Sequence, residues 1–370
     1  MREKIIPQFI SRDQFLNNRQ SSLGGGRANR GKIQLVHKFE DIVSVENLLS
    51  AWQEFVRGKR SKPDVQQFSI NLIDNILQLH EDLVNKNYRH GGYHQFKISD
   101  PKPRDINKAS VRDRLVHHAI YRILYPFFDK TFIAGSYSCR NNKGTHKALE
   151  KFQRMFYQMS RNNTRTVWVL KLDIKKFFAS INHEVLKDIL AKHIPDKDIL
   201  WLLDNIINSF PPVDKSNDRY FYQHIGLPLG NLTSQLLVNV YMNEFDQFMK
   251  HQLKAKYYIR YADDFVILSH NKQELINQLS IIQTYLETKL KLTLHPNKIF
   301  LNTFASGIDF LGWVNFPTHR VLRTATKKRM MKRIKNNPRD ATLQSYLGLL
   351  KHGDAHKLSQ EVLLVNGDVF

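Results

Sequence analysis

The chain has 370 residues, of which 56 are Lys or Arg and 34 are Asp or Glu, so its formal net charge is +22. At about 100–200 residues per domain, this length predicts two or three structural units. A hydrophobic fraction of 42% is enough for a sizeable core and excludes wholesale disorder. The surplus of positive charge makes a polyanion the first partner to consider.

The single cysteine, Cys139, excludes an intramolecular disulfide and any zinc site that needs two or more cysteines. The N-terminus leads into no apolar run of signal-peptide length, and no stretch approaches the roughly 18 apolar residues of a membrane span. We therefore expect a cytoplasmic protein without a membrane partner.

Residues 17–32 are rich in Gly, Ser, Asn and Arg and contain no acidic residue. This composition is typical either of a basic arm that folds on nucleic acid, through Arg27 and Arg30, or of a plain linker.

Apolar residues at helical spacing predict amphipathic helices over about 65–84, 112–128 and from 145 onwards. The stretch from Phe96 to Arg104 contains two prolines and is expected to be extended. A β-rich run over 167–173 predicts a strand that ends on Asp173. Further helices are predicted between 184 and 209, over about 233–253 and over 273–290.

Two β-rich runs, 257–261 and 265–268, flank Ala262-Asp263-Asp264 and predict a hairpin with acidic residues at its tip. Residues 299–314 look extended again. From Arg323 the pattern is helical, and between 320 and 335 there are eight Lys or Arg and no acid. The basic face of this predicted helix is either a phosphate-binding surface or an ordinary solvated surface.

A sheet that places these strands side by side would cluster Asp173 with Asp263 and Asp264. Such carboxylates repel one another unless a cation neutralises them, and oxygen ligands favour Mg²⁺. Two ions about 3.5–4 Å apart can stabilise the attacking and leaving oxygens of a phosphoryl displacement. The basic surface would then bind the rest of the polymer.

These residues resemble the motifs of reverse transcriptases. LDIKKFF at 172–178 resembles the first catalytic motif, and YADD at 261–264 resembles the Y-x-D-D hairpin. The stretches 103–106 and 111–118 resemble the fingers segment of bacterial and group II intron-like members, and FLGW at 310–313 resembles the strand pair that grips the primer. The four blocks follow the family's order and cover about residues 45–345.

The resemblance implies an α+β fold, a right-hand polymerase with fingers, a palm of antiparallel sheet with helices, and a helical thumb. Residues 1–44 would form a basic, partly flexible extension, 45–165 the fingers and the start of the palm, 166–315 the palm with the catalytic motifs, and 316–370 the thumb and tail. The implied activity is RNA-directed DNA polymerisation with two Mg²⁺ ions, or Mn²⁺ in their place. The implied partners are template RNA, an RNA/DNA template–primer and deoxynucleoside triphosphates.

The stretch LGNLTSQ at 229–235 narrows the subgroup, because Leu229 replaces the family's usual Gln and Gln235 replaces its Pro. This pattern resembles reverse transcriptases of diversity-generating retroelements, as do SCR at 138–140 and KGTH at 143–146. Such enzymes copy a template repeat RNA into cDNA with errors at template adenines, and the cDNA replaces part of a target gene (mutagenic retrohoming). They work with a small, basic, oligomeric accessory protein.

The resemblance also implies roles for single residues. Asp173, Asp263 and Asp264 would hold the metal, with the backbone carbonyl of Ile174. The residues expected around the nucleotide are Lys102, Arg104, Phe178, Leu229, Gly230, Gln235 and Lys298. Of these, Arg104 would contact the triphosphate, Phe178 would exclude a ribose 2′-hydroxyl and Lys298 would protonate pyrophosphate. The thumb residues expected on the nucleic-acid backbone are Arg323, Lys327, Lys328, Arg329, Lys332 and Arg333.

Several alternatives stay open at this point. Phe178 and Leu229 could be core residues, and Lys298 could be a surface lysine. The chain could also be a reverse transcriptase of a phage-defence or CRISPR-linked system. A third possibility is a non-catalytic RNA-binding protein on a polymerase fold, although the retained aspartates speak against it.

Overall fold

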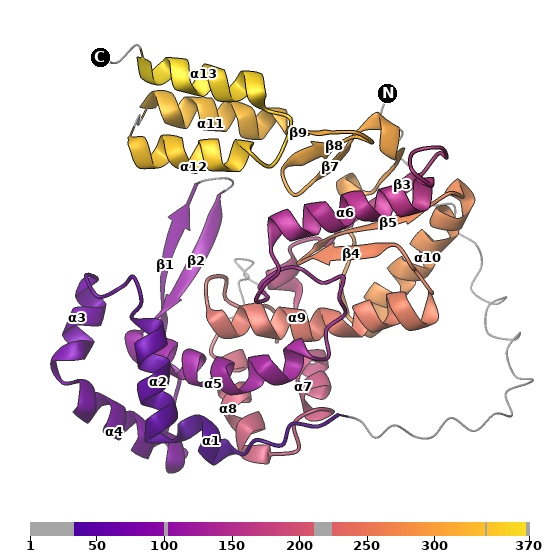
Figure 1. Cartoon of the computed structure of the whole chain (residues 1–370). Coiled ribbons are helices and arrows are strands. Elements are labelled where there is room, and N and C mark those ends of the chain that lie inside the picture. Colours follow the sequence, from indigo (N-terminus) through magenta and orange to yellow (C-terminus); the bar gives the residue numbers. More distant parts are fainter. Residues whose placement is uncertain (1–32, 100–102, 211–223, 337–338, 368–370) are drawn as a thin grey trace, which may run out of the picture.

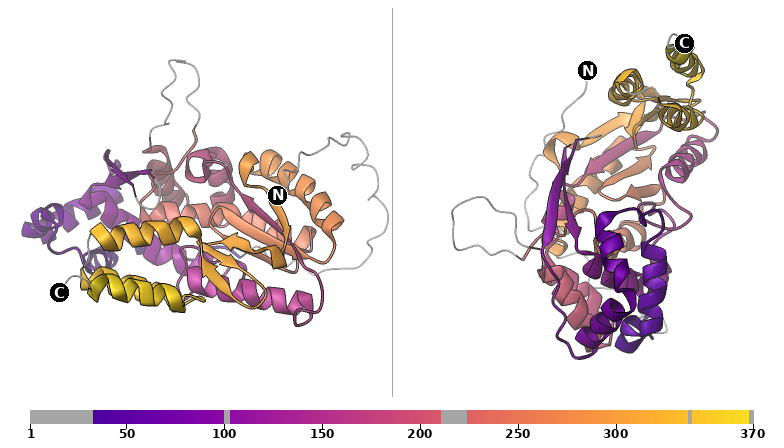
Figure 2. Two further views of the ribbon diagram at one scale, coloured as in Figure 1. Left: turned by 90° about the horizontal axis from the view of Figure 1, so that it is seen from above. Right: turned by 90° about the vertical axis from the view of Figure 1, so that its left-hand side faces the viewer.

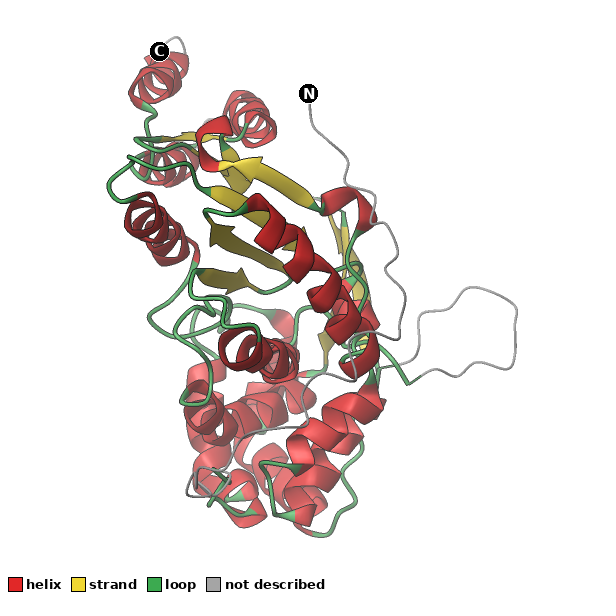
Figure 3. Ribbon diagram, turned by 90° about the vertical axis from the view of Figure 1, so that its right-hand side faces the viewer, coloured by secondary structure: helices red, strands yellow, loops and turns green. Residues whose placement is uncertain are grey.

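The computed structural model describes residues 33–99, 103–210, 224–336 and 339–367 (Figure 1). The predicted site residues Arg27, Arg30 and Lys102 lie outside these described residues. Helices gather at both ends of the molecule, and most of the strands lie between them (Figure 3).

The N-terminal region is helical and carries a two-stranded antiparallel hairpin. Its elements are α1 (Phe39–Val43), α2 (Val45–Phe55), α3 (Pro63–Ile70), α4 (Leu72–Val84), β1 (Tyr93–Ile98), β2 (Arg104–Ala109) and α5 (Val111–Asp129). The single helix predicted over 65–84 is wrong, because Asn71, with φ −114° and ψ 47°, separates α3 from α4. Of the stretch 96–104, which is predicted to be extended, residues 96–98 lie in β1 and Arg104 begins β2, so the prediction is confirmed for these described residues.

The central sheet has four antiparallel strands in the order β4-β5-β3-β6. They are β3 (Trp168–Asp173), β4 (Tyr258–Tyr261), β5 (Asp264–Ser269) and β6 (Phe300–Thr303). The predicted hairpin with acids at its tip is therefore present as β4 and β5. The helices around the sheet are α6 (Thr145–Ser160), α7 (His183–Ala191), α8 (Lys197–Asn208), α9 (Leu232–Gln247) and α10 (Lys272–Lys289).

The two faces of the sheet contribute to different cores. Leu170 and Leu172 belong to a core with α5 and α7 to α10, whereas Val169 belongs to a second core with α6 and the C-terminal elements. This division follows from the period of two in a strand, which sends successive side chains to opposite faces. The first core includes residues on both sides of position 166, and the second core includes residues on both sides of 166 and of 316. The cores therefore do not divide at these positions, and the domain boundaries there stay predictions.

The C-terminal region begins with a three-stranded antiparallel sheet, β7 (Ile308–Phe310), β8 (Trp313–Asn315) and β9 (Arg320–Leu322). Three helices follow, α11 (Thr324–Asn336), α12 (Asp340–Leu350) and α13 (His356–Gly367). They lie at the end of the molecule opposite to α1–α4, and the β1–β2 hairpin extends from the N-terminal helices toward that end (Figures 1 and 2).

Four short helical turns complete the described elements. They are η1 (Phe177–Ser180), the π-helical η2 (Phe248–Gln252), η3 (Pro296–Lys298) and η4 (Phe304–Ser306). In the part of the chain that the structure describes, none of the helices combines the length and apolar character needed to cross a membrane.

A buried ion pair joins α9 to strand β4. The guanidinium of Arg260 donates to both carboxylate oxygens of Asp246, at 2.9 and 2.6 Å, and neither side chain is exposed. The hydroxyl of Tyr258 also donates to Asp246, at 2.7 Å, and Arg260 donates to the carbonyl of Ala262 at 3.1 Å. Because a buried charge is costly without a partner, this arrangement fixes the turn that precedes Asp263.

Asp246→Ala should lower the free energy of unfolding by about 3–5 kcal/mol, because it leaves Arg260 as an uncompensated buried charge. Urea denaturation followed by tryptophan fluorescence measures this loss. The control is Lys187→Ala, which removes partly exposed ion pairs with Glu184 and Asp204 and should cost less than about 1 kcal/mol. Similar losses for both variants would contradict a special role of the buried pair.

Candidate active site

The sheet brings the three predicted carboxylates to one end. Asp173 on β3 lies directly opposite Asp264 on β5, and the Ile174 N–H donates to the carbonyl of Asp263 at 3.2 Å. Residues directly opposite in an antiparallel pair share a face, with Cβ atoms about 4.5–5.5 Å apart. The register of β3 and β5 therefore holds these carboxylates together.

The tip of the hairpin is held by backbone contacts. Ala262 adopts φ +54°, in the left-handed region that a residue with a Cβ seldom occupies. The hydrogen bond from Arg260 to the Ala262 carbonyl supports this conformation. The turn can therefore reverse the chain within two residues and place Asp263 at its end.

Two lysines lie against the carboxylates. Lys298 of η3 donates to Oδ1 of Asp173 at 2.8 Å, and Nζ of Lys171 lies 3.5 Å from Oδ2 of Asp264. Sequence reasoning identified Lys298 but missed Lys171. The signal was available, because Lys171 precedes Asp173 by two residues in a strand and so shares its face.

The environment disfavours ionisation of two of these carboxylates. Burial raises the pKa of Asp264 to about 7; the Lys171 ammonium opposes this shift, and the charges of Asp173 and Asp263 add to it. Burial, and then the charge of Asp173, also raises the pKa of Asp263, while Lys298 and Arg104 oppose the shift. Arg104 of β2 is therefore close enough to act on the carboxylate cluster.

The donor set fits a divalent cation. Oδ1 of Asp264 is buried and has no hydrogen-bond partner among the described residues, and the raised pKa values mark negative charge that is incompletely compensated. The described chain holds no ready-made group of three or more His, Cys, Asp or Glu for a metal. Instead, the ammonium groups of Lys171 and Lys298 stand where a cation would neutralise the carboxylates. Carboxylate oxygens are the ligands that Mg²⁺ prefers.

Hydrogen bonds join the β1–β2 hairpin to the turn before α9. The Asn107 N–H donates to the carbonyl of Leu229 at 3.0 Å, and the side-chain amide of Asn231 donates to the carbonyl of Asn107 at 3.1 Å. The strand that begins with Arg104 is thereby fixed against Leu229 and Gly230. Asn107 and Asn231 were missed, because no local pattern identifies the partners of an amide so far apart in the chain.

Phe178 is hydrogen-bonded to the segment that leads into the turn before α9, and Gln235 lies in α9 just after this turn. The Leu227 N–H donates to the carbonyl of Phe178 at 2.8 Å, and the ring of Phe178 is half-buried against the first core. Gln235, in the first turn of α9, is also half-buried. The position of Phe178 is thus compatible with both expectations, a residue beside the nucleotide and a core residue.

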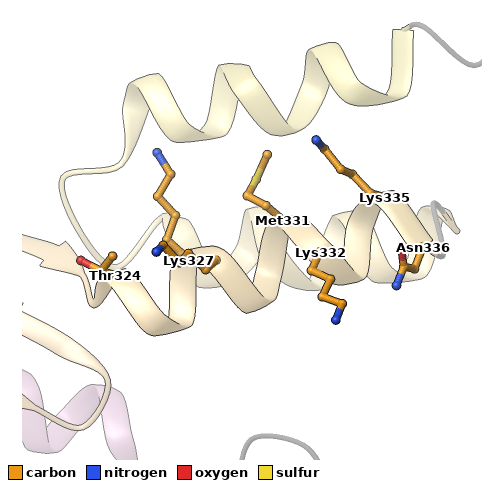
Figure 4. Close-up of a pocket in the computed structure, with 7 residues that line it drawn as sticks. Thr324, Lys327, Met331, Lys332, Lys335 and Asn336 are labelled. Atoms are coloured by element: carbon orange, nitrogen blue, oxygen red, sulfur yellow. The ribbon is translucent and has the colours of Figure 1, made fainter.

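The predicted thumb residues lie on or just before α11. Lysines 327, 328, 332 and 335 line a groove together with Thr324, Met331 and Asn336. Lys327, Met331 and Lys335 point toward the neighbouring helix, and Lys332 points away from it (Figure 4). Lys327 forms an ion pair with Glu361 of α13 at 3.3 Å, and Arg323 forms one with Asp309 at 3.2 Å. Arg329 and Arg333 occupy the same helix.

This architecture is that of a right-hand nucleic-acid polymerase, with helical fingers that carry a hairpin, a palm of antiparallel sheet and a helical thumb. The sequence model of one family, described as "Reverse transcriptase (RNA-dependent DNA polymerase)", matches residues 97–314. The chain belongs to this family, so the predicted fold class and the predicted enzyme class, an RNA-directed DNA polymerase, are confirmed.

The relatives include intron-encoded proteins. Protein YkfC of Escherichia coli (strain K12) is 24% identical over 298 residues, covering 72% of this chain and 75% of YkfC. The group II intron-encoded protein LtrA of Lactococcus lactis subsp. cremoris is 23% identical over 296 residues, covering 63% of this chain and 47% of LtrA. An uncharacterized 91 kDa protein in the cob intron of Schizosaccharomyces pombe is 27% identical over 197 residues, covering 53% of this chain and 23% of that protein. The chain thus spans less than half the length of these two intron-encoded relatives.

Among solved structures, telomerase from Candida albicans, in complex with the TWJ fragment of telomeric RNA, aligns with a TM-score of 0.48 at 12% identity. The alignment covers 71% of this chain and 54% of the telomerase chain.

Gly230→Ala should weaken nucleotide binding. Gly230 has φ +113°, and a Cβ there would lie 2.9 Å from Cγ2 of Ile106 on β2, so the Ile106 side chain, or the hairpin and the turn, must shift. Strain of about 1–3 kcal/mol predicts a rise in the KM for deoxynucleoside triphosphates of roughly 10-fold. The control is Gly92→Ala, since a Cβ at Gly92 meets nothing within 4 Å. An unchanged KM in the Gly230 variant would contradict the coupling of hairpin and turn.

Proposed function

We propose that this chain is the polymerase of a diversity-generating retroelement, which copies a template repeat RNA into cDNA with errors at template adenines and so diversifies a target gene. The observation that carries the proposal is Leu229. An apolar side chain stands here where most reverse transcriptases have Gln, and its carbonyl is bonded to the strand that begins with Arg104.

The substitution has a direct physical consequence. A Gln side chain offers two N–H donors and a carbonyl acceptor, whereas Leu offers none. If position 229 borders the template base and the incoming nucleotide, fewer directional contacts hold the pair. Discrimination between correct and incorrect pairs then falls. Relatedness to group II intron-encoded proteins is compatible with this subgroup and with the defence-linked alternative, so the proposal rests on Leu229 and its context.

The catalytic assignment rests on the cluster at the sheet end. Asp173, Asp263 and Asp264, with the carbonyl of Ile174, would hold the divalent ions. When bound, such ions neutralise the triphosphate and stabilise the charge that develops during phosphoryl transfer. The rigid strands of the palm keep the three carboxylates together without any contribution from the substrate.

The surrounding residues act on the nucleotide. The Arg104 guanidinium would bind triphosphate oxygens, for which its planar donors suit bidentate contact. The Lys298 ammonium would carry the proton that neutralises leaving pyrophosphate. The ring of Phe178 would fill the space that a ribose 2′-hydroxyl needs, so that deoxynucleotides are selected.

The nucleic acid would extend from the palm to the thumb. The lysines of α11 suit a phosphate backbone and would bind it without reading sequence. We also propose that a small basic accessory protein assists the polymerase, as in the retroelements that this chain resembles. A near-repeat of the template that differs only at adenines, in the DNA that flanks the gene, would support the proposal independently.

Asp263→Asn should lower primer extension on an RNA template by about 10²–10⁴-fold, because it removes a ligand charge while preserving the side-chain shape. Gel analysis of a labelled primer with deoxynucleoside triphosphates measures the rate. The control is Asp188→Asn, an exposed aspartate on α7 that should leave the rate unchanged. Equal synthesis by the Asp263 variant and the native chain would refute the catalytic assignment and favour the non-catalytic alternative.

Leu229→Gln should reduce misincorporation opposite template adenines by about 10-fold, since restored hydrogen bonds are expected to contribute about 1–3 kcal/mol of discrimination. Sequencing of cDNA made on an adenine-containing RNA template measures the error. Leu232→Gln, three residues along the same segment, is the control and should keep the native error frequency. If error at adenines is the same in the Leu229 variant, the proposed subgroup loses its main support.

A further inference from the structure

The outer face of α6 is basic. Its apolar side chains, among them Ala148, Leu149 and Phe152, are buried in the second core. The opposite face carries Lys147, Lys151 and Arg154 at intervals of four and three residues, so they follow one another along the helix surface. Glu150 is the only acidic residue of this helix.

Neighbouring segments extend this basic face. Lys143 lies in the loop before α6, and Lys254 and Lys256 lie in the segment before β4, a strand that contacts α6. Burial lowers the pKa of Lys143, as do the charges of Arg140, Lys147 and Lys151, although Asp129 opposes the shift. Burial also lowers the pKa of Lys250; the charge of Lys151 adds to this shift, and the charge of Asp246 opposes it. These cations are therefore close enough to repel one another.

The cations of this face form no ion pair with an acidic residue in the part of the chain that the structure describes. Lys143 and Lys147 donate to the carbonyls of Ala134 and Asn142, and within the described ranges neither forms an ion pair. The same holds, among those residues, for Lys151, Arg154, Lys254 and Lys256. By contrast, the three arginines of α5 at positions 112, 114 and 122 each pair with a carboxylate. In the described part of the chain, the face of α6 thus carries more positive charge than its one acid, Glu150, can offset.

We propose that the outer face of α6, with Lys143, Lys254 and Lys256, is a second binding surface that holds the phosphate backbone of structured RNA outside the polymerase cleft. The inference rests on the proposed function, because an RNA-copying polymerase is the context that supplies this ligand. Cations that replace counterions along a phosphate backbone give sequence-independent, salt-sensitive binding.

The position of the face beside an RNA-copying site favours RNA as its ligand, and its composition argues against a membrane or an apolar protein. The Thr145 hydroxyl donates to that of Tyr261 at 3.3 Å, so α6 begins beside the catalytic hairpin and runs along the palm away from it (Figure 1). An RNA bound there would lie next to the template path without occupying it. Tyr157 is the only exposed large hydrophobic residue of α6, which argues against insertion into a membrane or docking of an apolar protein surface.

The test uses the full chain and the triple variant Lys147→Ala, Lys151→Ala and Arg154→Ala. Fluorescence anisotropy measures its affinity for an RNA hairpin, for a DNA hairpin of the same sequence and for vesicles of phosphatidylcholine with phosphatidylserine. The control triple variant, Arg57→Ala, Arg60→Ala and Lys62→Ala, removes the same charge from exposed positions in the fingers. Thermal unfolding checks that both variants fold, and primer extension on a short template–primer measures the polymerase activity separately.

The α6 triple variant should bind the RNA hairpin about 10-fold more weakly or worse at 0.1 M salt, and the salt slope of log K should fall by about 2–3. Its primer extension and its thermal midpoint should match those of the native chain. A loss on RNA, with or without a loss on the DNA hairpin, supports the surface.

Unchanged RNA affinity, an equal loss in the control triple, or a loss confined to DNA or to vesicles would overturn the proposal. If the native chain fails to extend primers, the proposed function fails, while the binding measurement still decides the role of α6.

Discussion

The structure depends on the concentration of negative charge at one end of the palm sheet. Backbone pairing of β3 with β5 places Asp173 opposite Asp264, and the turn adds Asp263. The cluster is unfavourable by itself, because burial and mutual repulsion penalise the ionised carboxylates. Lys171, Lys298 and Arg104 offset part of this cost, and a divalent cation would offset more. A polymerase that uses divalent ions needs such a site, since the uncompensated negative charge attracts the metal through which the triphosphate is bound.

The rest of the chain positions cations around this charge. The buried pair of Asp246 and Arg260 stiffens the hairpin that carries Asp263. The bonds of Asn107 to Leu229 and Asn231 bring the fingers strand, and with it Arg104, to the same end of the sheet. Farther away, the basic residues of α6 and α11 form the two surfaces that we propose bind phosphates. On these proposals, the net charge of +22 would be divided between a local role at the carboxylates and a distributed role along the nucleic acid.

Sequence alone revealed the elements whose patterns are local. The apolar runs around Ala262-Asp263-Asp264 predicted β4 and β5, and the motif order predicted the family that the comparisons confirm. The break at Asn71 was missed, because apolar spacing continues across it. The partnership of Asp246 with Arg260 was missed too, since nothing local says which buried charge meets which. Lys171 could have been found from the alternation of strand side chains. The roles of the individual site residues stay predictions.

The central claim is that Asp173 and Asp263 bind the divalent ions of a polymerase. Electron paramagnetic resonance of Mn²⁺ titrated into the full chain tests it most directly, because free and bound ions are counted without any need for catalysis. The native chain should bind Mn²⁺ saturably, and a variant with Asp173→Asn and Asp263→Asn should lose most of this binding while keeping its thermal midpoint. Equal Mn²⁺ binding by the native chain and a folded double variant would contradict the account.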